Sequence, residues 1–447
     1  MTLRNGSKAT LGCFLALVTG LIFLGSCGGG SSSSTTGPPA SNNTVPMTVG
    51  FGALGPAGGY VNGIWATVTV CVPGSTTNCQ TVDNVLVDTG SAGLRILNSA
   101  LTTVPASSLT AVAGDSSGDQ LQECIQYGDT SYTWGPIFVA NVGLAGETAS
   151  SLPIQVIGDT SALVPSQCLS TPVLSGYGND DTVQALGGNG ILGVGAFGYP
   201  YDCGGYCTDP SELAASGYPY YVCPSGQACS AVMTTTQAAN PIVSFSSSDN
   251  NGVLITLPSI PAAGAASGTV SGSLIFGIGT QSDNALASTA TVYALDGYGN
   301  IPTFTYSGVQ YASPTNYSVL DTGSEALYFL DNTTLATSGI VDCADYTGLY
   351  CPSNTVPFSI TAYGATSTSG TITFSIANAD NLFASGNAAF NDLGGDSGTS
   401  PANDFFDFGL PFFFGKTVYV GMTPGAFGTE SPPPSAASSA AYGYYAF

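Results

Sequence analysis

The chain has 447 residues and contains 27 acidic residues, four basic residues and no histidine. The absence of histidine excludes Ser-His-Asp and Cys-His catalysis and any metal site built on imidazole. After Cys27 only Arg95 and Lys416 are basic, which gives this portion a net charge of −25. Such a surface repels nucleic acid phosphates, so a polynucleotide partner is not expected. The charge would fade below about pH 4, which suits an acidic environment, although low basicity could equally serve solubility.

The N-terminus has the pattern of an export signal. Arg4 and Lys8 precede an apolar run, Leu11 to Leu24, that is too short to span a bilayer. The ending Leu-Gly-Ser-Cys at residues 24–27 resembles a bacterial lipoprotein signal, and an ordinary secretory signal is the alternative. We therefore predict a signal peptide over residues 1–26.

Lipidation of Cys27 would follow from this signal. Gly28 follows the cysteine, a pattern that favours the outer membrane of a bacterial cell envelope. The side of that membrane on which the protein lies, periplasmic or external, stays open. Residues 27–44 are rich in Gly and Ser, which predicts a flexible tether. Membrane contact is expected only through the lipid, and the chain is expected to be a monomer.

Ten cysteines remain when Cys13 and Cys27 are set aside, and an even set in an exported chain indicates disulfides. The short-range candidates are Cys71–Cys79 and Cys343–Cys351, and Cys124–Cys168 is a longer one. Four cysteines between residues 203 and 229 could pair in more than one way or bind zinc: Cys203, Cys207, Cys223 and Cys229. An exported chain favours disulfides there.

From Val45 onward, short runs of β-branched and aromatic residues alternate with Gly, Pro, Asn and Ser, and long runs with helical periodicity are missing. This pattern predicts an all-β fold. A small-residue stretch at 262–268 suggests a boundary between an N-terminal β lobe, 45–265, and a C-terminal β lobe, 266–425. Residues 203–229 look like an insertion, and the Pro/Ser/Ala-rich tail at 426–447 is expected to be loose.

Two copies of Asp-Thr-Gly-Ser, at 88–91 and 321–324, each follow an apolar, strand-like run. One copy alone would more often be a turn, because Asp caps and Gly supplies positive φ. Two copies in the same context favour two halves that bring Asp88 and Asp321 together. Adjacent carboxyl groups share one proton, so the charged partner can deprotonate a water while the other polarises a carbonyl. This hydrolysis requires no metal and no cofactor, and the pair titrates as a unit.

A hairpin with a polar, aromatic tip is predicted over Cys124 to Gly135, with Tyr127, Gly128 and Asp129 at the tip. Such a hairpin could cover a substrate and exclude water, or its aromatic residues could simply pack down. Calcium could bind at Asn179-Asp180-Asp181 or around Asp392, but no loop has the ligand spacing of a calcium site.

Six segments, in order, resemble those of the pepsin-like aspartic proteases. They are the two Asp-Thr-Gly-Ser loops, the Tyr-Gly-Asp of the hairpin at 127–129, the Ile-Leu-Gly at 191–193, the segment 271–277 and the Phe-Gly at 408–409. The resemblance covers nearly the whole chain after the tether. It implies a bilobal fold of two six-stranded-type β lobes with a cleft between them, and a peptide or protein as the substrate.

The resemblance also implies roles for the loop residues. Asp88 and Asp321 would be the acid/base pair, and Tyr127 would close over an extended peptide. The other members of the two loops would support the pair, with the threonines bonded across the lobes and the serines holding the outer carboxylate oxygens: Thr89, Gly90, Ser91, Thr322, Gly323 and Ser324.

Two positions depart from the family pattern. Arg95 stands where the family usually has Trp, and Asp407 stands where the last bracing strand is usually apolar. Arg95 could be a surface base or could act on the nearby acids. These differences fit a remote bacterial lipoprotein branch of the fold. The expected function is an aspartic endopeptidase active at acidic pH, and the alternative is a non-catalytic surface lipoprotein that binds peptide or polysaccharide.

Overall fold

The computed structural model describes residues 43–447 except 59, 159–161, 170–177, 197–201, 204–206, 209–218, 225–226, 298, 314–317, 398–404 and 423–442. Strands predominate in this part of the chain, and its longest α-helix has six residues. The prediction of an all-β fold is confirmed. The predicted signal peptide, the lipidated Cys27 and most of the tether lie outside the described residues. None of the helices that are described is long and apolar enough to cross a membrane.

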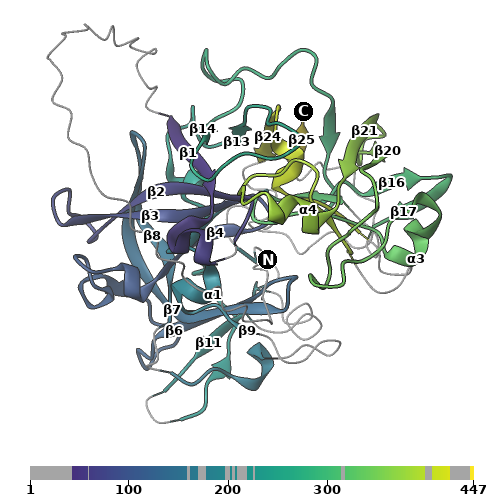
Figure 1. Ribbon diagram of the computed structural model, residues 1–447. Helices are drawn as coiled ribbons and strands as arrows, with labels where there is room; N and C mark the ends of the chain where they lie inside the picture. The colour runs from purple at the N-terminus through teal and green to yellow at the C-terminus, as the bar shows by residue number, and fades with distance from the viewer. Residues whose placement is uncertain are drawn as a thin grey trace, which may run out of the picture.

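One large mixed sheet runs through the molecule (Figure 1). Its seventeen described strands are β1 (Thr44–Gly50), β2 (Gly63–Cys71), β3 (Cys79–Asp88), β4 (Ala92–Leu97), β5 (Thr110–Ala111), β6 (Leu121–Gln126), β7 (Ser131–Leu144), β8 (Glu147–Ile157), β9 (Gly178–Asn179), β10 (Gly190–Val194), β11 (Tyr220–Val222), β12 (Ser230–Ala231), β13 (Gly252–Thr256), β14 (Val270–Phe276), β15 (Val292–Ala294), β24 (Thr417–Met422) and β25 (Gly443–Ala446).

Two four-stranded sheets complete the β-structure of the C-terminal half. One contains β16 (Thr303–Tyr306), β17 (Val309–Ala312), β20 (Val356–Tyr363) and β21 (Ser369–Ile376), and the other contains β18 (Ser318–Leu320), β19 (Leu327–Phe329), β22 (Gly394–Gly395) and β23 (Phe406–Phe408). In Figure 1 the first of these sheets lies on the right, while β2, β3 and β4 lie on the left.

The helices are short connections. The described α-helices are α1 (Val183–Leu186), α3 (Asn332–Leu335) and α4 (Ala379–Ala384), and the described 3-10 helices are η1 (Gly52–Gly58), η2 (Asn98–Ala100), η3 (Ala106–Ser108), η4 (Ser166–Cys168), η6 (Pro241–Ser244), η7 (Ala336–Ser338) and η8 (Leu410–Phe413). Each α-helix begins at a polar residue whose side chain accepts a backbone N–H: Thr182, Asp331 and Asn378. Such N-caps satisfy donors that the first turn leaves free.

Strands from both halves pair in the middle of the large sheet. β1 pairs with β14, β13 pairs with both β14 and β24, and β24 pairs with β25. The predicted boundary at residue 265 lies in the connection between β13 and β14, which hydrogen-bond to each other. The halves are therefore joined by continuous strand pairing, and the main hydrophobic core contains residues from both of them.

The C-terminal end corrects one expectation. Residues 443–446 belong to the predicted loose tail, but they form β25 between β15 and β24. Tyr445 is only 1% exposed, and Tyr293 stacks on Phe447 with ring centroids 5.2 Å apart. Burial of aromatic rings holds this end of the chain in the sheet.

The same three-strand arrangement occurs in each half. In the first, β10 pairs in parallel with β3 and antiparallel with β4. In the second, β23 pairs in parallel with β18 and antiparallel with β19. Each arrangement places an Asp-Thr-Gly-Ser loop between its two outer strands. The segments at 191–193 and 408–409 thus lie on, or directly after, the middle strand beside each loop.

Four of the five disulfides link cysteines at most eight residues apart, and Cys124–Cys168 spans 44 residues. The predicted pairs Cys71–Cys79, Cys124–Cys168 and Cys343–Cys351 are present. The four cysteines left open pair as Cys203–Cys207 and Cys223–Cys229. Their sulfurs are consequently not free to bind zinc as thiolates.

Candidate active site

The two Asp-Thr-Gly-Ser loops meet where β3 and β18 end. The Gly90 N–H lies 2.7 Å from Asp88 Oδ1 and 3.1 Å from Asp321 Oδ1, so one donor contacts both carboxyl groups. The structure therefore places side by side the two aspartates that the sequence analysis paired across 233 residues.

Glycine is required beside each carboxyl group. A Cβ atom at Gly90 would lie 2.6 Å from Asp321 Cγ, and one at Gly323 would lie 2.9 Å from Asp88 Cγ. Both distances are shorter than a carbon–carbon contact allows. A side chain at either position would push the two aspartates apart.

The two threonines lock the loops together symmetrically. The Thr322 N–H donates to Thr89 Oγ1 at 3.0 Å, and the Thr89 N–H donates to Thr322 Oγ1 at 3.1 Å. Each hydroxyl then donates to a carbonyl of the opposite half, Thr89 to Leu320 O at 2.8 Å and Thr322 to Val87 O at 2.7 Å. Both threonines are buried. These four bonds fix the backbone on which the aspartates are carried.

The serines contact the outer carboxylate oxygens, as the resemblance implies. Ser91 Oγ donates to Asp88 Oδ2, and Ser324 Oγ lies 2.8 Å from Asp321 Oδ2. Ser324 Oγ also lies 2.6 Å from Oδ2 of Asp407. No second carboxyl group contacts Ser91 among the contacts of the described residues, so the two loops differ at this point.

Burial decides the protonation of the carboxyl groups around the loops. Asp88 is 7% exposed, and Asp321 is partly exposed, so water reaches the pair from one side. Burial, reinforced by the negative charge of Asp321, raises the pKa of Asp88. Because adjacent buried carboxylates cannot both ionise cheaply, the pair holds a proton well above the usual range of an aspartate.

Glu325 and Asp407 add two further buried carboxyl groups. Burial raises the pKa of Glu325 to about 8, even though its Oε1 accepts the Val61 N–H at 3.0 Å. Burial also raises the pKa of Asp407 well above its usual range, and the charge of Asp321 raises it further. Two positive side chains lie in the described part of the chain, Arg95 and Lys416, and neither forms an ion pair with these groups.

The predicted hairpin is formed by β6 and β7, with residues 127–130 at its tip. Tyr127 is partly exposed and packs against the cluster formed by Leu97, Ile157, Leu186 and Ile191, and its hydroxyl lies 3.3 Å from Thr133 Oγ1. Gly128 has open space around it.

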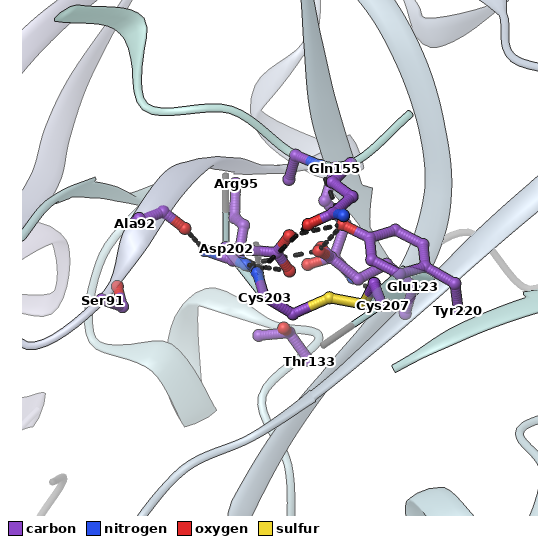
Figure 2. A network of polar contacts seen from close by, with 12 residues as sticks. Ser91, Ala92, Arg95, Glu123, Thr133, Gln155, Asp202, Cys203, Cys207 and Tyr220 are labelled. Carbon is purple, nitrogen blue, oxygen red and sulfur yellow. Dashed lines mark hydrogen bonds and ion pairs between the residues drawn. A yellow bond between two sulfur atoms is a disulfide. The ribbon is translucent and has the colours of Figure 1, made fainter. Parts of the chain in front are cut away.

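Arg95 is not a surface base, and Figure 2 shows its surroundings. Its side chain is 1% exposed, and Nη2 lies 3.3 Å from Glu123 Oε1 and 3.4 Å from Asp202 Oδ2. Nη1 donates to Ala92 O at 2.9 Å, directly after the first Asp-Thr-Gly-Ser loop. The buried guanidinium thus ties this loop to the hairpin strand β6 and to the segment around Cys203.

Tyr220 completes this network from β11, the strand that pairs with β6. Its hydroxyl lies 2.7 Å from Glu123 Oε1 and 2.8 Å from Asp202 Oδ1. Burial raises the pKa of Asp202, and the charge of Glu123 raises it further. Tyr220, which lies within the predicted insertion, therefore contacts both acidic partners of Arg95.

Several residues near the loops were not predicted as site residues. Tyr60 donates from its hydroxyl to Gly323 O at 3.3 Å, and Asn62 Nδ2 donates to Glu325 O at 2.7 Å. These contacts join the segment before β2 to the second loop. No motif marks this segment in the sequence, because its partners are about 260 residues away.

A metal site was not expected. The one group of metal-ligating residues found among the described residues is Cys343, Cys351 and Asp380, and its two sulfurs form a disulfide.

Comparison with known proteins places the chain in a family. It belongs to the family described as "Protein of unknown function (DUF3443)", whose model matches residues 39–438. No curated protein matches. Among solved structures, the chain is similar to the crystal structure of an aspartic proteinase from Irpex lacteus, with 16% sequence identity, a TM-score of 0.46, and 90% of this chain and 96% of that chain covered.

Proposed function

We propose that the protein is an aspartic-type endopeptidase that hydrolyses peptide bonds between its two Asp-Thr-Gly-Ser loops. The observation that carries this proposal is the single Gly90 N–H that contacts both Asp88 Oδ1 and Asp321 Oδ1. Two carboxyl groups close enough to accept from the same N–H share one proton, which supplies an acid and a base at the same place.

The reaction follows from that shared proton. A water bound between the two groups loses its proton to the ionised carboxylate as its oxygen attacks the peptide carbonyl carbon. The protonated carboxyl group donates a hydrogen bond to the carbonyl oxygen, which gains negative charge. The proton that the carboxylate took from the water then passes to the leaving nitrogen when the C–N bond breaks. The pepsin dyad is the established example of this chemistry.

The loop contacts support the proposal by holding the carboxyl groups in place. The hydrogen bonds of the threonines fix the loops relative to each other. The serine hydroxyls donate to the outer carboxylate oxygens, and the Gly90 N–H donates to the inner ones. Catalytic groups contribute most when their own hydrogen bonds fix their orientation before substrate binds. We assign substrate binding to the hairpin residues Tyr127, Gly128 and Asp129.

Activity at acidic pH follows from the requirement for one ionised partner and one protonated partner. Net negative charge and the buried acids also favour the folded protein at low pH, because both are relieved by protonation. We further propose that the protein is a monomeric outer-membrane lipoprotein, anchored through Cys27, with its lobes divided near residue 265.

Cleavage of an unfolded protein at about pH 3–5 tests the proposal. We expect the oxidised, folded protein to cleave, a statine-type inhibitor to block cleavage, and Asp88→Asn or Asp321→Asn to abolish it. Binding of a peptide without cleavage by the wild type, at any pH, would instead support the alternative of a non-catalytic binding protein.

A further inference from the structure

The two catalytic loops have the same sequence, and in each the glycine N–H and the serine hydroxyl donate to the aspartate, but different residues lie behind their serines. Leu320, the residue before Asp321, pairs with Phe408, as Val87, the residue before Asp88, pairs with Leu192. By this register Asp407 occupies the place that Ile191 occupies in the first half. A carboxyl group therefore lies behind the second loop where an isoleucine lies behind the first.

Strand alternation explains why the Asp407 side chain faces the loop. Phe406 and Phe408 flank it on β23 and are fully buried in the main hydrophobic core. Because successive side chains of a strand point to opposite faces, Asp407 points away from this core. It lies there against Ser324.

Ser324 Oγ is within hydrogen-bond distance of two carboxylate oxygens, at 2.8 Å from Asp321 Oδ2 and 2.6 Å from Asp407 Oδ2. A serine hydroxyl carries one hydrogen and can donate to only one of them. The other carboxyl group must then carry a proton and donate it to Ser324 Oγ, because two lone pairs facing each other at this distance repel.

The donor is the group that holds fewer hydrogen bonds. Asp321 Oδ1 accepts the N–H groups of Gly323 at 2.7 Å and Gly90 at 3.1 Å. Asp407 Oδ1 is buried without a hydrogen-bond partner in the described structure, and the side chain is 8% exposed. Ionising a buried carboxyl group with an unpartnered oxygen is costly, whereas Asp321 offers a negative charge two backbone donors.

We propose that Asp407 is a positioning residue that stays protonated and donates through Ser324 to Asp321, so that Asp321 is the ionised base of the pair and Asp88 the protonated acid. This assignment rests on the proposed function. Hydrogen bonds in a chain strengthen one another, so a Ser324 hydroxyl that accepts from Asp407 is a better donor to a charged Asp321.

Every titratable group that acts on Asp407 within the described structure is an acid or a phenol. These groups are Asp321 and Asp88 in the loops, Tyr328 on β19 and Tyr445 on β25. None of them can lower the energy of a charged Asp407. Burial correspondingly raises its pKa.

The first test measures the proton without using activity. The folding equilibrium constant of the wild type, divided by that of Asp407→Asn, should fall up to tenfold for each pH unit above about pH 4. The wild type has to hold a proton on Asp407 in the folded state, whereas asparagine does not titrate. Asn keeps the size of the side chain and can still donate to Ser324. A ratio that stays constant from pH 4 to pH 7 would mean that Asp407 is already ionised, and would overturn the proposal.

The second test uses the acidic limb of the cleavage profile, which reports the ionisation of the base. Asp407→Ile introduces the residue that stands at the equivalent position 191 of the first half. We expect it to shift the acidic limb up by about one pH unit, so that the cleavage rate on that limb falls tenfold at a given pH. Asp407→Asn should keep the limb within about 0.3 units, because its amide can donate. Equal limbs for wild type and Asp407→Ile would overturn the role. If no variant cleaves anything, the endopeptidase proposal fails while the stability test still decides the proton.

Discussion

Thr89 and Thr322 exchange hydrogen bonds across the two halves of the molecule, each backbone N–H donating to the hydroxyl of the other, at 3.1 and 3.0 Å. Both hydroxyls also donate to buried carbonyls. The catalytic geometry that we propose depends on this exchange, because the aspartates are the residues immediately before the threonines.

Replacing either threonine with the isosteric valine removes one acceptor and one donor. Thr89→Val leaves the Thr322 N–H and the Leu320 carbonyl without these partners, and we expect a loss of about 2–4 kcal/mol in the free energy of unfolding. The two substitutions remove different hydrogen bonds, so the double variant should lose more than either single variant and up to the sum of the two. Denaturant unfolding of the four proteins checks this, and a double variant no less stable than the single variants would contradict it.

A methyl group at Gly90 should damage the pair directly. In Gly90→Ala the new Cβ would lie 2.6 Å from Asp321 Cγ, so we expect destabilisation of roughly 1–3 kcal/mol and loss of cleavage. Gly128→Ala is the matched control for stability, because nothing lies within 4 Å of its Cβ position. Thermal unfolding of the two variants tests the difference. Equal stabilities would show that the loops have room to relax.

Arg95 should be essential for folding at neutral pH. Arg95→Met leaves Glu123 and Asp202 buried without their cation, which typically costs about 3–5 kcal/mol. The loss should be smaller near pH 4, since burial raises the pKa of Asp202 and that acid can then be neutral. Denaturant unfolding at pH 4 and pH 7 gives the comparison, with Arg95→Lys as the charge-retaining variant. A loss of the same size at both pH values would contradict an electrostatic role.

Glu325 should make the folded protein less stable as the pH rises. Its pKa is raised from 4.5 to about 8 by burial, so the folded protein holds a proton that the unfolded chain releases. The stabilisation is complete below about pH 4.5 and is lost as the pH approaches 8, by a few kcal/mol in total. Lys416 does not act in this window, because its pKa is lowered only to about 8.

Unfolding of Glu325→Gln between pH 4.5 and pH 8 isolates this effect. The variant should lose less stability over the range than the wild type, because glutamine does not titrate. Asp345→Asn, at an exposed position, serves as the control and should follow the wild type. A Glu325→Gln curve parallel to the wild type would show that Glu325 is ionised in the fold.

The main features of the candidate site are predictable from sequence because the same sequence pattern occurs in both halves of the chain. The repeated Asp-Thr-Gly-Ser loops, their preceding apolar strands and the bracing segments at 191–193 and 408–409 are local patterns, and the structure brings them together. Short loops between cysteines likewise allowed Cys71–Cys79 and Cys343–Cys351 to be predicted, and Cys124–Cys168 was predicted as a longer link.

Contacts between residues far apart in sequence could not be predicted in this way. Asp202 lies 107 residues from Arg95, and nothing in its segment marks it as the partner of a buried guanidinium. The strand β25 was not predicted either, because its four residues follow a Pro/Ser/Ala-rich run that is typical of a loose tail. Asp407 was visible as an acid between two phenylalanines. Its contact with Ser324 depends on the register of β23 against β18, which one sequence does not fix.

The dependence of kcat/KM on pH, for cleavage of a quenched peptide, tests the central claim most directly. We predict a bell-shaped profile with its maximum in the acid range, in which the two limbs report the pair in the free enzyme. Asp88→Asn and Asp321→Asn should each abolish turnover while leaving the protein folded at neutral pH. Absence of turnover across the whole range from about pH 2 to 8, in wild-type protein whose folding and disulfides have been verified, would contradict the account.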